Sequence, residues 1–263
     1  MAPSTRAYFT RIDDDTFAPT DCAAGAWRED ELHLAPVAGL IVDHLERWRT
    51  AHAAGLQFSR FSLEVLGQIA RDRIELSVEV IRPGRTIELV EATAVIGGRP
   101  TVRARGWLLQ VSETAEVAEN EFAPLPPPET FTEPSWLKRW KGGMIDTVQA
   151  WQADDTRPGR ARAWVTTDVE LIAGEPATAL GDYAKLWDTA NGISLRQDPH
   201  VWMYPNVDLT AHLFRQPAGR WLGLDTRVAF GPSGVGLTSS VLHDEQGPVG
   251  TLAQSLTLRR HLS

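Results

Sequence analysis

The feature of the sequence that most constrains its fold is an internal duplication. Apolar residues follow one helical spacing in the first half, at Leu34, Val37, Ala38, Ile41 and Leu45. The same spacing returns 146 residues later, at Leu180, Tyr183, Ala184, Trp187 and Asn191. Each set matches the 3.6-residue period of a helix with one buried face. The repeat therefore predicts two similar units in one chain.

Each predicted helix is preceded by a hairpin and followed by strands with period-two alternation. The expected hairpins pair 8–12 with 16–20 and 144–151 with 161–167, and the expected strands include 61–65, 74–80, 207–213 and 222–228. Leu63 and Leu209 are again 146 residues apart, and Pro100 and Pro248 open equivalent final strands. A long helix wrapped by a curved antiparallel sheet, twice in one chain, describes an α+β double hotdog. The alternative is an α+β protein whose halves agree by chance.

The segment between the halves is acidic and rich in proline, with three consecutive prolines at 126–128. Such a segment is typical of a linker that cannot join a sheet. We therefore predict an N-terminal hotdog repeat over 1–112, a linker over 113–140 and a C-terminal hotdog repeat over 141–263.

Charge and composition exclude several functions. The 263 residues carry 26 basic and 34 acidic side chains, a formal net charge of −8, and no basic stripe. We therefore expect no nucleic-acid partner. The single cysteine, Cys22, cannot form an internal disulfide. The longest apolar run, 34–42, is about half of a membrane span, and no stretch resembles a signal peptide. These features predict a soluble cytoplasmic protein without a membrane span.

Familiar catalytic motifs do not occur in the sequence. It contains no G-x-S-x-G elbow, Walker loop, G-x-G-x-x-G fingerprint or H-E-x-x-H pair. None of the seven histidines is paired at ligand spacing, so we expect no metal site.

Three polar residues interrupt apolar patterns. Gln254 shares one strand face with Leu252 and Leu256, so it either makes hydrogen bonds in the core or lines a cavity. Asn191 lies on the second helical stripe, where a helix C-terminus before Gly192 is the other interpretation. Strict alternation groups Asp208 with Thr210, opposite Leu209, but its place near the start of a strand leaves this phase open, and a solvated carboxylate at a strand edge is the other interpretation.

Several segments resemble one family. They are LIAGEP from Leu171, ALGDYAKLWDTANGIS from Ala179, YPNVDLTAHLFRQPAGRWLGLD from Tyr204 and PVGTLAQSLTLRR from Pro248. In the first half, FAPTDCAAGAW, VIRPGRTIELVEATAV and GGRPTVRARG add to the likeness. Together these segments resemble the thioesterase-like, actinobacterial subgroup of acyl-CoA thioesterase II-type proteins, which have two fused hotdog domains. The resemblance extends over nearly the whole chain.

The resemblance implies hydrolysis of an acyl-CoA thioester by an activated water, without a metal or other cofactor. Enzymes of this type use an Asp, a Gln and a Thr. By position, the resemblance places the catalytic Asp on Asp208 and the Gln on Gln254, whereas the expected Thr falls on Ala229. A carboxylate can accept a proton from water, and an amide can hold the water or the thioester oxygen.

The resemblance also implies a substrate-binding region at the start of the first helix. Relatives usually have His-Gly-Gly there, and this chain has His33, Leu34 and Ala35. Small residues would let backbone N–H groups approach an oxyanion. With these three residues we expect Gly39 and Asn191 to bind the substrate. Gly106 in the first half aligns with Gln254 in the second, so we expect at most one complete site per chain.

Two functions are therefore in competition. The first is an acyl-CoA thioester hydrolase acting on acyl-CoA or a related thioester. The second is a non-catalytic double-hotdog protein that binds acyl-CoA or an acyl chain, which the missing Thr and the Leu34–Ala35 pair favour. A hotdog hydratase would need a His and Asp pair that the sequence does not offer. Exposed sheet edges also predict a homodimer.

Overall fold

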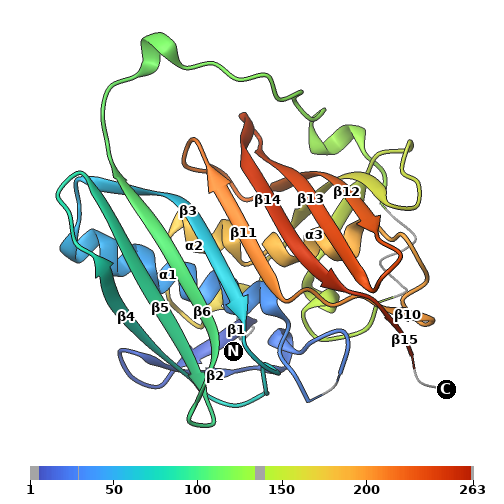
Figure 1. Cartoon of the computed structure of the whole chain (residues 1–263), viewed down its shortest axis with the longest axis horizontal. Helices are drawn as coiled ribbons and strands as arrows, with labels where there is room; N and C mark the ends of the chain where they lie inside the picture. Colours follow the sequence, from blue (N-terminus) through green and yellow to red (C-terminus); the bar gives the residue numbers. More distant parts are fainter. Residues whose placement is uncertain (1–5, 29, 134–139, 262–263) are drawn as a thin grey trace, which may run out of the picture.

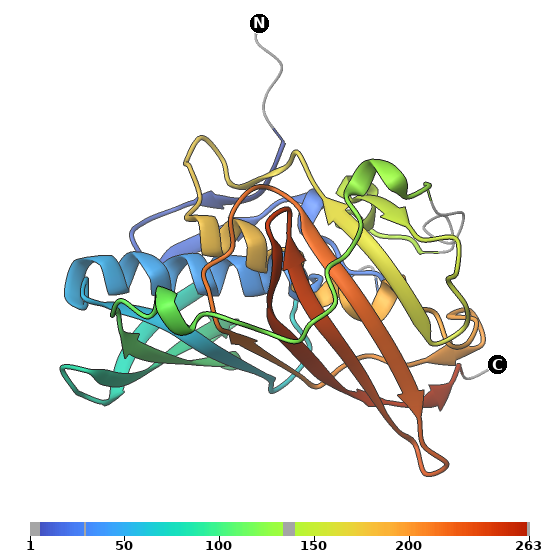
Figure 2. The same ribbon diagram turned by 90° about the horizontal axis from the view of Figure 1, so that it is seen from above.

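The computed structural model describes residues 6–28, 30–133 and 140–261. Most of its strands form one sheet of thirteen strands, in the order β7-β8-β12-β13-β14-β11-β3-β6-β5-β4-β2-β1-β9. Neighbouring strands are antiparallel except β1 and β9, which run parallel. The helices lie against one face of this sheet, which curves around them (Figures 1 and 2).

The first half contributes six strands and one long helix. Their bounds are β1 Ala7–Arg11, β2 Thr16–Pro19, α1 Leu34–His52, β3 Leu56–Val65, β4 Ile74–Arg82, β5 Ile87–Ile96 and β6 Arg99–Gln110. The predicted first helix and its hairpin are confirmed, since β1 pairs with β2. The apolar face of α1 is buried, with Val37, Ala38, Ile41 and Leu45 inaccessible to solvent.

The second half repeats this order with a shorter helical region. Its elements are β7 Gln149–Gln152, β8 Arg160–Thr166, β9 Glu170–Ile172, α2 Ala179–Ala184, α3 Ala190–Ile193, β10 Trp202–Met203, β11 Asp208–Leu213, β12 Leu222–Phe230, β13 Val235–Asp244, β14 Gly247–Thr257 and β15 Arg259–Arg260. A 3₁₀ turn over Trp187–Thr189 separates α2 from α3. The continuous second helix predicted from the spacing is therefore wrong, because the chain leaves α-helical geometry after Ala184.

The two halves meet where β11 pairs with β3. Leu209 lies directly opposite Leu63 in this ladder. These two leucines are equivalent in the sequence duplication, so each half presents the same strand to the other. The helices also meet, because Gly39 of α1 and Gly181 of α2 allow close approach: a Cβ atom on Gly39 would lie 2.5 Å from the Cβ of Lys185.

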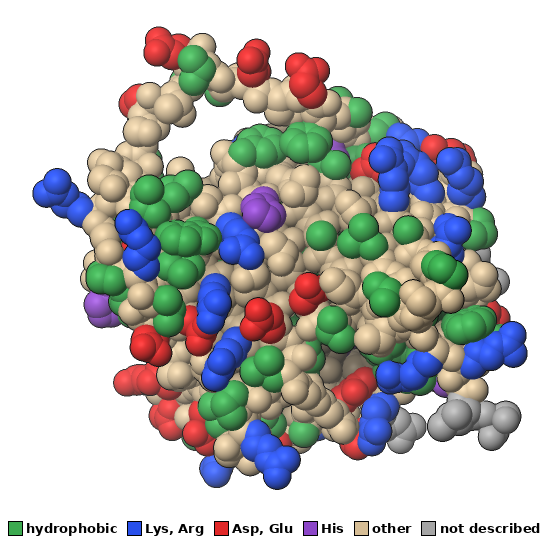
Figure 3. Space-filling model, viewed as in Figure 1, with side chains coloured by type: hydrophobic (Ala, Val, Ile, Leu, Met, Phe, Trp, Pro, Cys, Tyr) green, Lys and Arg blue, Asp and Glu red, His purple; other side chains and the backbone are tan. Residues whose placement is uncertain are grey.

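The segment between the halves arches away from the body and returns over the second half (Figures 1 and 3). The Phe122 ring stacks on Phe214 with centroids 6.0 Å apart, and the Pro126 carbonyl accepts a hydrogen bond from the Trp164 indole at 2.7 Å.

Among the described helices, none is long and apolar enough to cross a membrane.

Candidate functional site

Gln254 points to the helix side of β14 and is almost fully buried. Its Nε2 donates a hydrogen bond to Asp188 Oδ1 at 2.7 Å, whereas its Oε1 has no protein partner. The prediction that Gln254 faces inward is confirmed. Its partner is a carboxylate that the sequence pattern did not single out.

Asp188 owes its position to the interruption of the second helix. The 3₁₀ turn after α2 directs both Trp187 and Asp188 into the protein, which a regular helix with one buried face would not do. Asn206, just before β11, donates a second hydrogen bond from Nδ2 to Asp188 Oδ1 at 3.0 Å. One carboxylate oxygen therefore accepts two amide hydrogen bonds.

Burial dominates the protonation of Asp188. Loss of hydration raises the pKa of its carboxyl from 3.8 to about 7, although the hydrogen bonds from Asn206 and Gln254 act in the opposite direction. A carboxylate with a pKa near 7 can exchange a proton with water close to neutral pH.

His33 completes this cluster from the other half of the chain. It is the N-cap of α1, and its Nδ1 accepts a hydrogen bond from the Ala35 amide at 3.1 Å. The same Nδ1 lies 3.3 Å from Asp188 Oδ2. Burial lowers the pKa of His33 to about 4, so the imidazole is neutral at physiological pH. We call Asp188, Gln254, Asn206 and His33 the carboxylate cluster.

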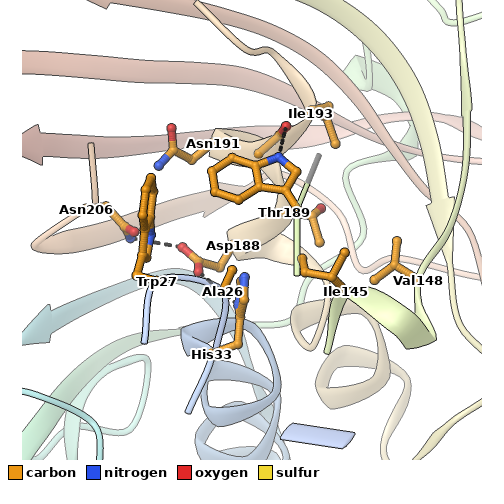
Figure 4. A pocket seen from close by; sticks show the side chains of 12 residues that line it. Ala26, Trp27, His33, Ile145, Val148, Asp188, Thr189, Asn191, Ile193 and Asn206 are labelled. Carbon is orange, nitrogen blue, oxygen red and sulfur yellow. Dashed lines mark hydrogen bonds and ion pairs between the residues drawn. The ribbon is translucent and has the colours of Figure 1, made fainter. Parts of the chain in front are cut away.

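A pocket of about 50 Å³ lies beside the carboxylate cluster (Figure 4), and we call it the inner pocket. Its apolar wall includes Ile145, Val148 and Ile193. The Trp27 and Trp140 rings meet edge to face with centroids 5.0 Å apart, and the Trp140 indole donates to the Gly192 carbonyl at 3.2 Å. The pocket is therefore a small chamber with mostly apolar walls and a carboxylate at one side.

A second cavity of about 270 Å³, which we call the outer cavity, reaches the same carboxylate from the surface. Trp27, His33 and Asp188 line both spaces. Arg259 and Gln68 line only the larger one. A ligand can thus reach Asp188 through a polar opening while a small apolar part occupies the inner pocket.

The structure does not bring Asp208 into this cluster. Its carboxylate accepts hydrogen bonds from the backbone N–H of Ser255 at 2.6 Å and from the Ser255 hydroxyl at 3.2 Å. Ser255 is exposed and follows the buried Gln254, so it points to the opposite face of β14. The predicted convergence of Asp208 with Gln254 is therefore wrong, because Asp208 faces the outer side of the sheet.

The other predicted positions divide into two groups. Asn191 lines the inner pocket and donates to the Tyr204 carbonyl at 2.9 Å, and Leu34 lines the outer cavity. Ala35 contributes its capped amide. Gly39 lies away from the site, because it serves the contact between α1 and α2. Ala229 is exposed on β12, so it cannot mark a missing catalytic hydroxyl.

Sequence reasoning missed Asp188 and Asn206. One feature of the sequence could have indicated Asp188. It is an acidic residue next to Trp187 of the apolar stripe, close to where that stripe ends at Asn191 and Gly192. Nothing in the alternation of β11 marks Asn206, which precedes the strand.

The polar groups around the pocket suit the activation of water. The described lining residues include one hydroxyl side chain, that of Thr189, which donates to the Leu186 carbonyl at 2.7 Å. The carboxylate and the two amides can instead orient a water molecule and accept its proton. Within the described ranges, no group of three or more His, Cys, Asp or Glu residues is arranged to hold a metal ion.

Comparison with known families identifies the class of protein. Residues 23–109 match the acyl-CoA thioesterase N-terminal domain, and residues 113–258 match the acyl-CoA thioesterase C-terminal domain. The chain therefore belongs to the acyl-CoA thioesterase family. A search of curated proteins found no match.

Solved structures show the same fold at low sequence identity. A protein with a hot dog fold from Alicyclobacillus acidocaldarius is 13% identical with a TM-score of 0.70, covering 98% of each chain. The tesB protein of Mycobacterium avium subspecies paratuberculosis is 15% identical with a TM-score of 0.66, covering 95% of this chain and 96% of the other. Acyl-CoA thioesterase II TesB2 from Mycobacterium marinum is 13% identical with a TM-score of 0.64, covering 96% of each chain. The chain thus has a hotdog fold.

Proposed function

We propose that the protein hydrolyses acyl-CoA thioesters with a water molecule activated by Asp188. The observation that carries this proposal is the buried carboxylate, bound by Gln254 and Asn206, at the junction of the inner pocket and the outer cavity. The resemblance implies an acidic residue, an amide and a hydroxyl. Here the carboxylate is that of Asp188 in place of Asp208. The amide of Asn206 takes the place of the implied hydroxyl.

In this mechanism the ionised Asp188 accepts a proton as the water oxygen attacks the thioester carbonyl carbon. The carbonyl electrons move onto oxygen, and the tetrahedral intermediate then collapses with cleavage of the C–S bond. The proton held by Asp188 passes to the departing thiolate, giving a carboxylic acid and free CoA. Gln254 and Asn206 hold Asp188 Oδ1, which fixes the direction from which the carboxylate reaches the water.

The N-terminus of α1 is the proposed oxyanion site. The first N–H groups of a helix have no intrahelical acceptor, and the helix dipole favours negative charge there. Leu34 and Ala35 begin this 19-residue helix next to His33 and Asp188. A carbonyl oxygen placed there would lie beside the attacking water.

The two cavities divide the substrate. The acyl group would enter the inner pocket beside Ile145 and Val148, and the CoA portion would extend through the outer cavity beside Arg259. A volume of about 50 Å³ exceeds that of one ordered water by only a few-fold, so it favours short acyl groups.

The non-catalytic binding protein now has less support. One of its arguments was Ala229 at the expected Thr position, and that residue faces outward. A pure binding protein also gains nothing from a buried carboxyl whose pKa is raised toward neutrality.

We also propose that the chain is a double hotdog, with repeats over 1–112 and 141–263 joined by a linker over 113–140. The pairing of Leu63 with Leu209 and the matching element order support this division. A homodimer stays a prediction. Among the described strands the sheet ends in β7 and β9, of four and three residues, which offer little edge for a second copy. Light scattering of the purified protein would measure the oligomeric state.

The direct test is thiol release from acyl-CoAs of two to sixteen carbons, comparing the wild type with Asp188→Asn and Asp208→Asn. We expect turnover of short acyl-CoAs, loss of turnover in Asp188→Asn and retention in Asp208→Asn. If no acyl-CoA is cleaved faster than in buffer alone, the proposed hydrolase activity is refuted. Turnover lost only in Asp208→Asn would refute the assignment of Asp188.

A further inference from the structure

We propose that His33 is a positioning residue that shares a proton with Asp188, accepting a hydrogen bond at Nδ1 from the protonated Oδ2. In the proposed hydrolysis, on which the catalytic part of this inference rests, His33 would stabilise the carboxyl group that forms when Asp188 takes a proton from water.

In a neutral imidazole one ring nitrogen carries the proton and the other has a lone pair that accepts hydrogen bonds. His33 Nδ1 accepts the Ala35 N–H at 3.1 Å, so this nitrogen carries no proton, and in the neutral ring the proton is on Nε2. The contact of Nδ1 with Asp188 Oδ2 at 3.3 Å therefore does not come from a charged imidazolium beside a carboxylate.

The other side of the contact leads to the same conclusion. Both amide donors of the carboxylate cluster, from Gln254 and Asn206, bind Oδ1 of Asp188. Oδ2 lies 3.3 Å from His33 Nδ1 instead. Two lone pairs facing each other in a buried site repel, whereas a proton on Oδ2 turns the contact into an O–H to nitrogen hydrogen bond.

Few other charges reach this pair. Among the described residues, Glu31 and Arg259 line the outer cavity that both groups share, and burial of each group is the largest cause of its shifted pKa. Burial and the two amide donors thus set the pKa of Asp188, and His33 is the remaining polar group of the carboxylate cluster in contact with it.

This arrangement has a consequence for the chemistry. As water attacks, its O–H bond breaks and a new O–H bond forms on Asp188 Oδ2, where His33 Nδ1 can accept it. Competition between this proton and the Ala35 N–H for the same lone pair weakens the cap as the proton arrives. The Ala35 N–H then becomes available to the carbonyl oxygen at the moment it gains negative charge.

Nuclear magnetic resonance of the whole chain with ¹⁵N-labelled histidine tests the shared proton without any turnover. We expect His33 to carry its proton on Nε2 at pH 7, and its Nδ1 signal to move in a step near pH 7, the value to which the Asp188 pKa is raised. The step should vanish in Asp188→Asn. A proton on Nδ1 at pH 7, or a step that survives in Asp188→Asn, would overturn the proposal.

His33→Ser and His33→Asn provide the second measurement, because serine and asparagine both cap helices. ¹³C-carboxyl aspartate labelling follows Asp188, whose signal is the one lost in Asp188→Asn. We expect its midpoint to fall by about half to one pH unit in both variants, since an acceptor for the protonated form is lost. An unchanged or higher midpoint would contradict the proposal.

Kinetics separate this inference from the proposed function. In both His33 variants the acidic limb of the kcat profile should move to lower pH with the carboxyl midpoint, and the plateau should fall several-fold. If the wild type cleaves no acyl-CoA, the hydrolase fails, and the two resonance measurements still decide whether His33 and Asp188 share a proton.

Discussion

Replacement of Asp188 by asparagine should abolish most of the activity and stabilise the fold above neutral pH. Asparagine has the same shape as a protonated carboxyl group. Its Oδ1 can accept the bonds from Gln254 and Asn206, and its Nδ2 can donate to His33 Nδ1. The variant therefore keeps the hydrogen bonds of the carboxylate cluster but cannot accept a proton from water. Loss of a general base costs about 10²- to 10⁴-fold in kcat.

The expected stabilisation follows from the pKa of Asp188. Its folded-state pKa is raised from 3.8 to about 7 by burial. Between these values the folded protein holds a proton that the unfolded chain releases, so the free energy of unfolding falls as pH rises from about 4 to 7 and stays lower above 7. At about 1.4 kcal/mol per pKa unit, a shift of roughly three units corresponds to at most about 4 kcal/mol. The asparagine variant lacks this loss.

Urea unfolding of both proteins at pH 5 and pH 8 measures the effect. The advantage of Asp188→Asn over the wild type should grow by up to about 3 kcal/mol between the two pH values, because about two of the three pKa units lie in that interval. Thiol release at pH 8 provides the activity. An advantage that is the same at both pH values, or smaller at pH 8, would show that the Asp188 pKa is not raised.

Three further predictions follow from other contacts. Gln254→Met removes a donor that lowers the Asp188 pKa, so the acidic limb of kcat should move to higher pH, and a shift to lower pH would contradict this role. Gly39→Ala should lower the free energy of unfolding in urea by about 1–3 kcal/mol, because the new Cβ would lie 2.5 Å from Lys185 at the end of α2. In the control Gly55→Ala the new Cβ meets nothing within 4 Å, so we expect no such loss. Equal effects of the two substitutions would refute the packing argument. Trp140→Ala should move the acyl-length optimum toward longer chains in the thiol assay, and an unchanged optimum would show that Trp140 does not limit the pocket.

Much of the fold could be predicted because its signals are local and periodic. The stripe of α1 matches a regular 19-residue helix, and the alternation around Leu63 and Leu209 matches β3 and β11. The duplication makes these two leucines equivalent, and the structure adds that they face each other across the junction of the halves, which the sequence analysis did not predict. Periodicity reports which side of an element is buried, and it did so for Gln254 as well.

The site was harder to predict because it depends on departures from periodicity. The helical spacing after Leu180 was extended through Asn191, although the chain changes to a 3₁₀ turn at Trp187, and this change turns Asp188 inward. The resemblance places the catalytic Asp on Asp208 by position, although strict alternation puts this residue on the face opposite Leu209. The hydrogen bonds of Asp208 to Ser255 on the outer face depend on the register between β11 and β14, which the sequence does not reveal.

The expectation of at most one complete site per chain has a physical reason in the packing around Gly106. Gly106 occupies the position in the first half that Gln254 occupies in the second, and a Cβ there would lie 2.4 Å from the Phe58 ring. Phe58 is itself buried, so a glutamine at 106 would need the core to move before its amide could reach the helix. The first half thus uses this position for packing, with an unbroken helix beside it. The second half has instead an interrupted helix and a buried carboxylate, and burial raises the pKa of that carboxyl to about 7, so that it can exchange a proton near neutral pH.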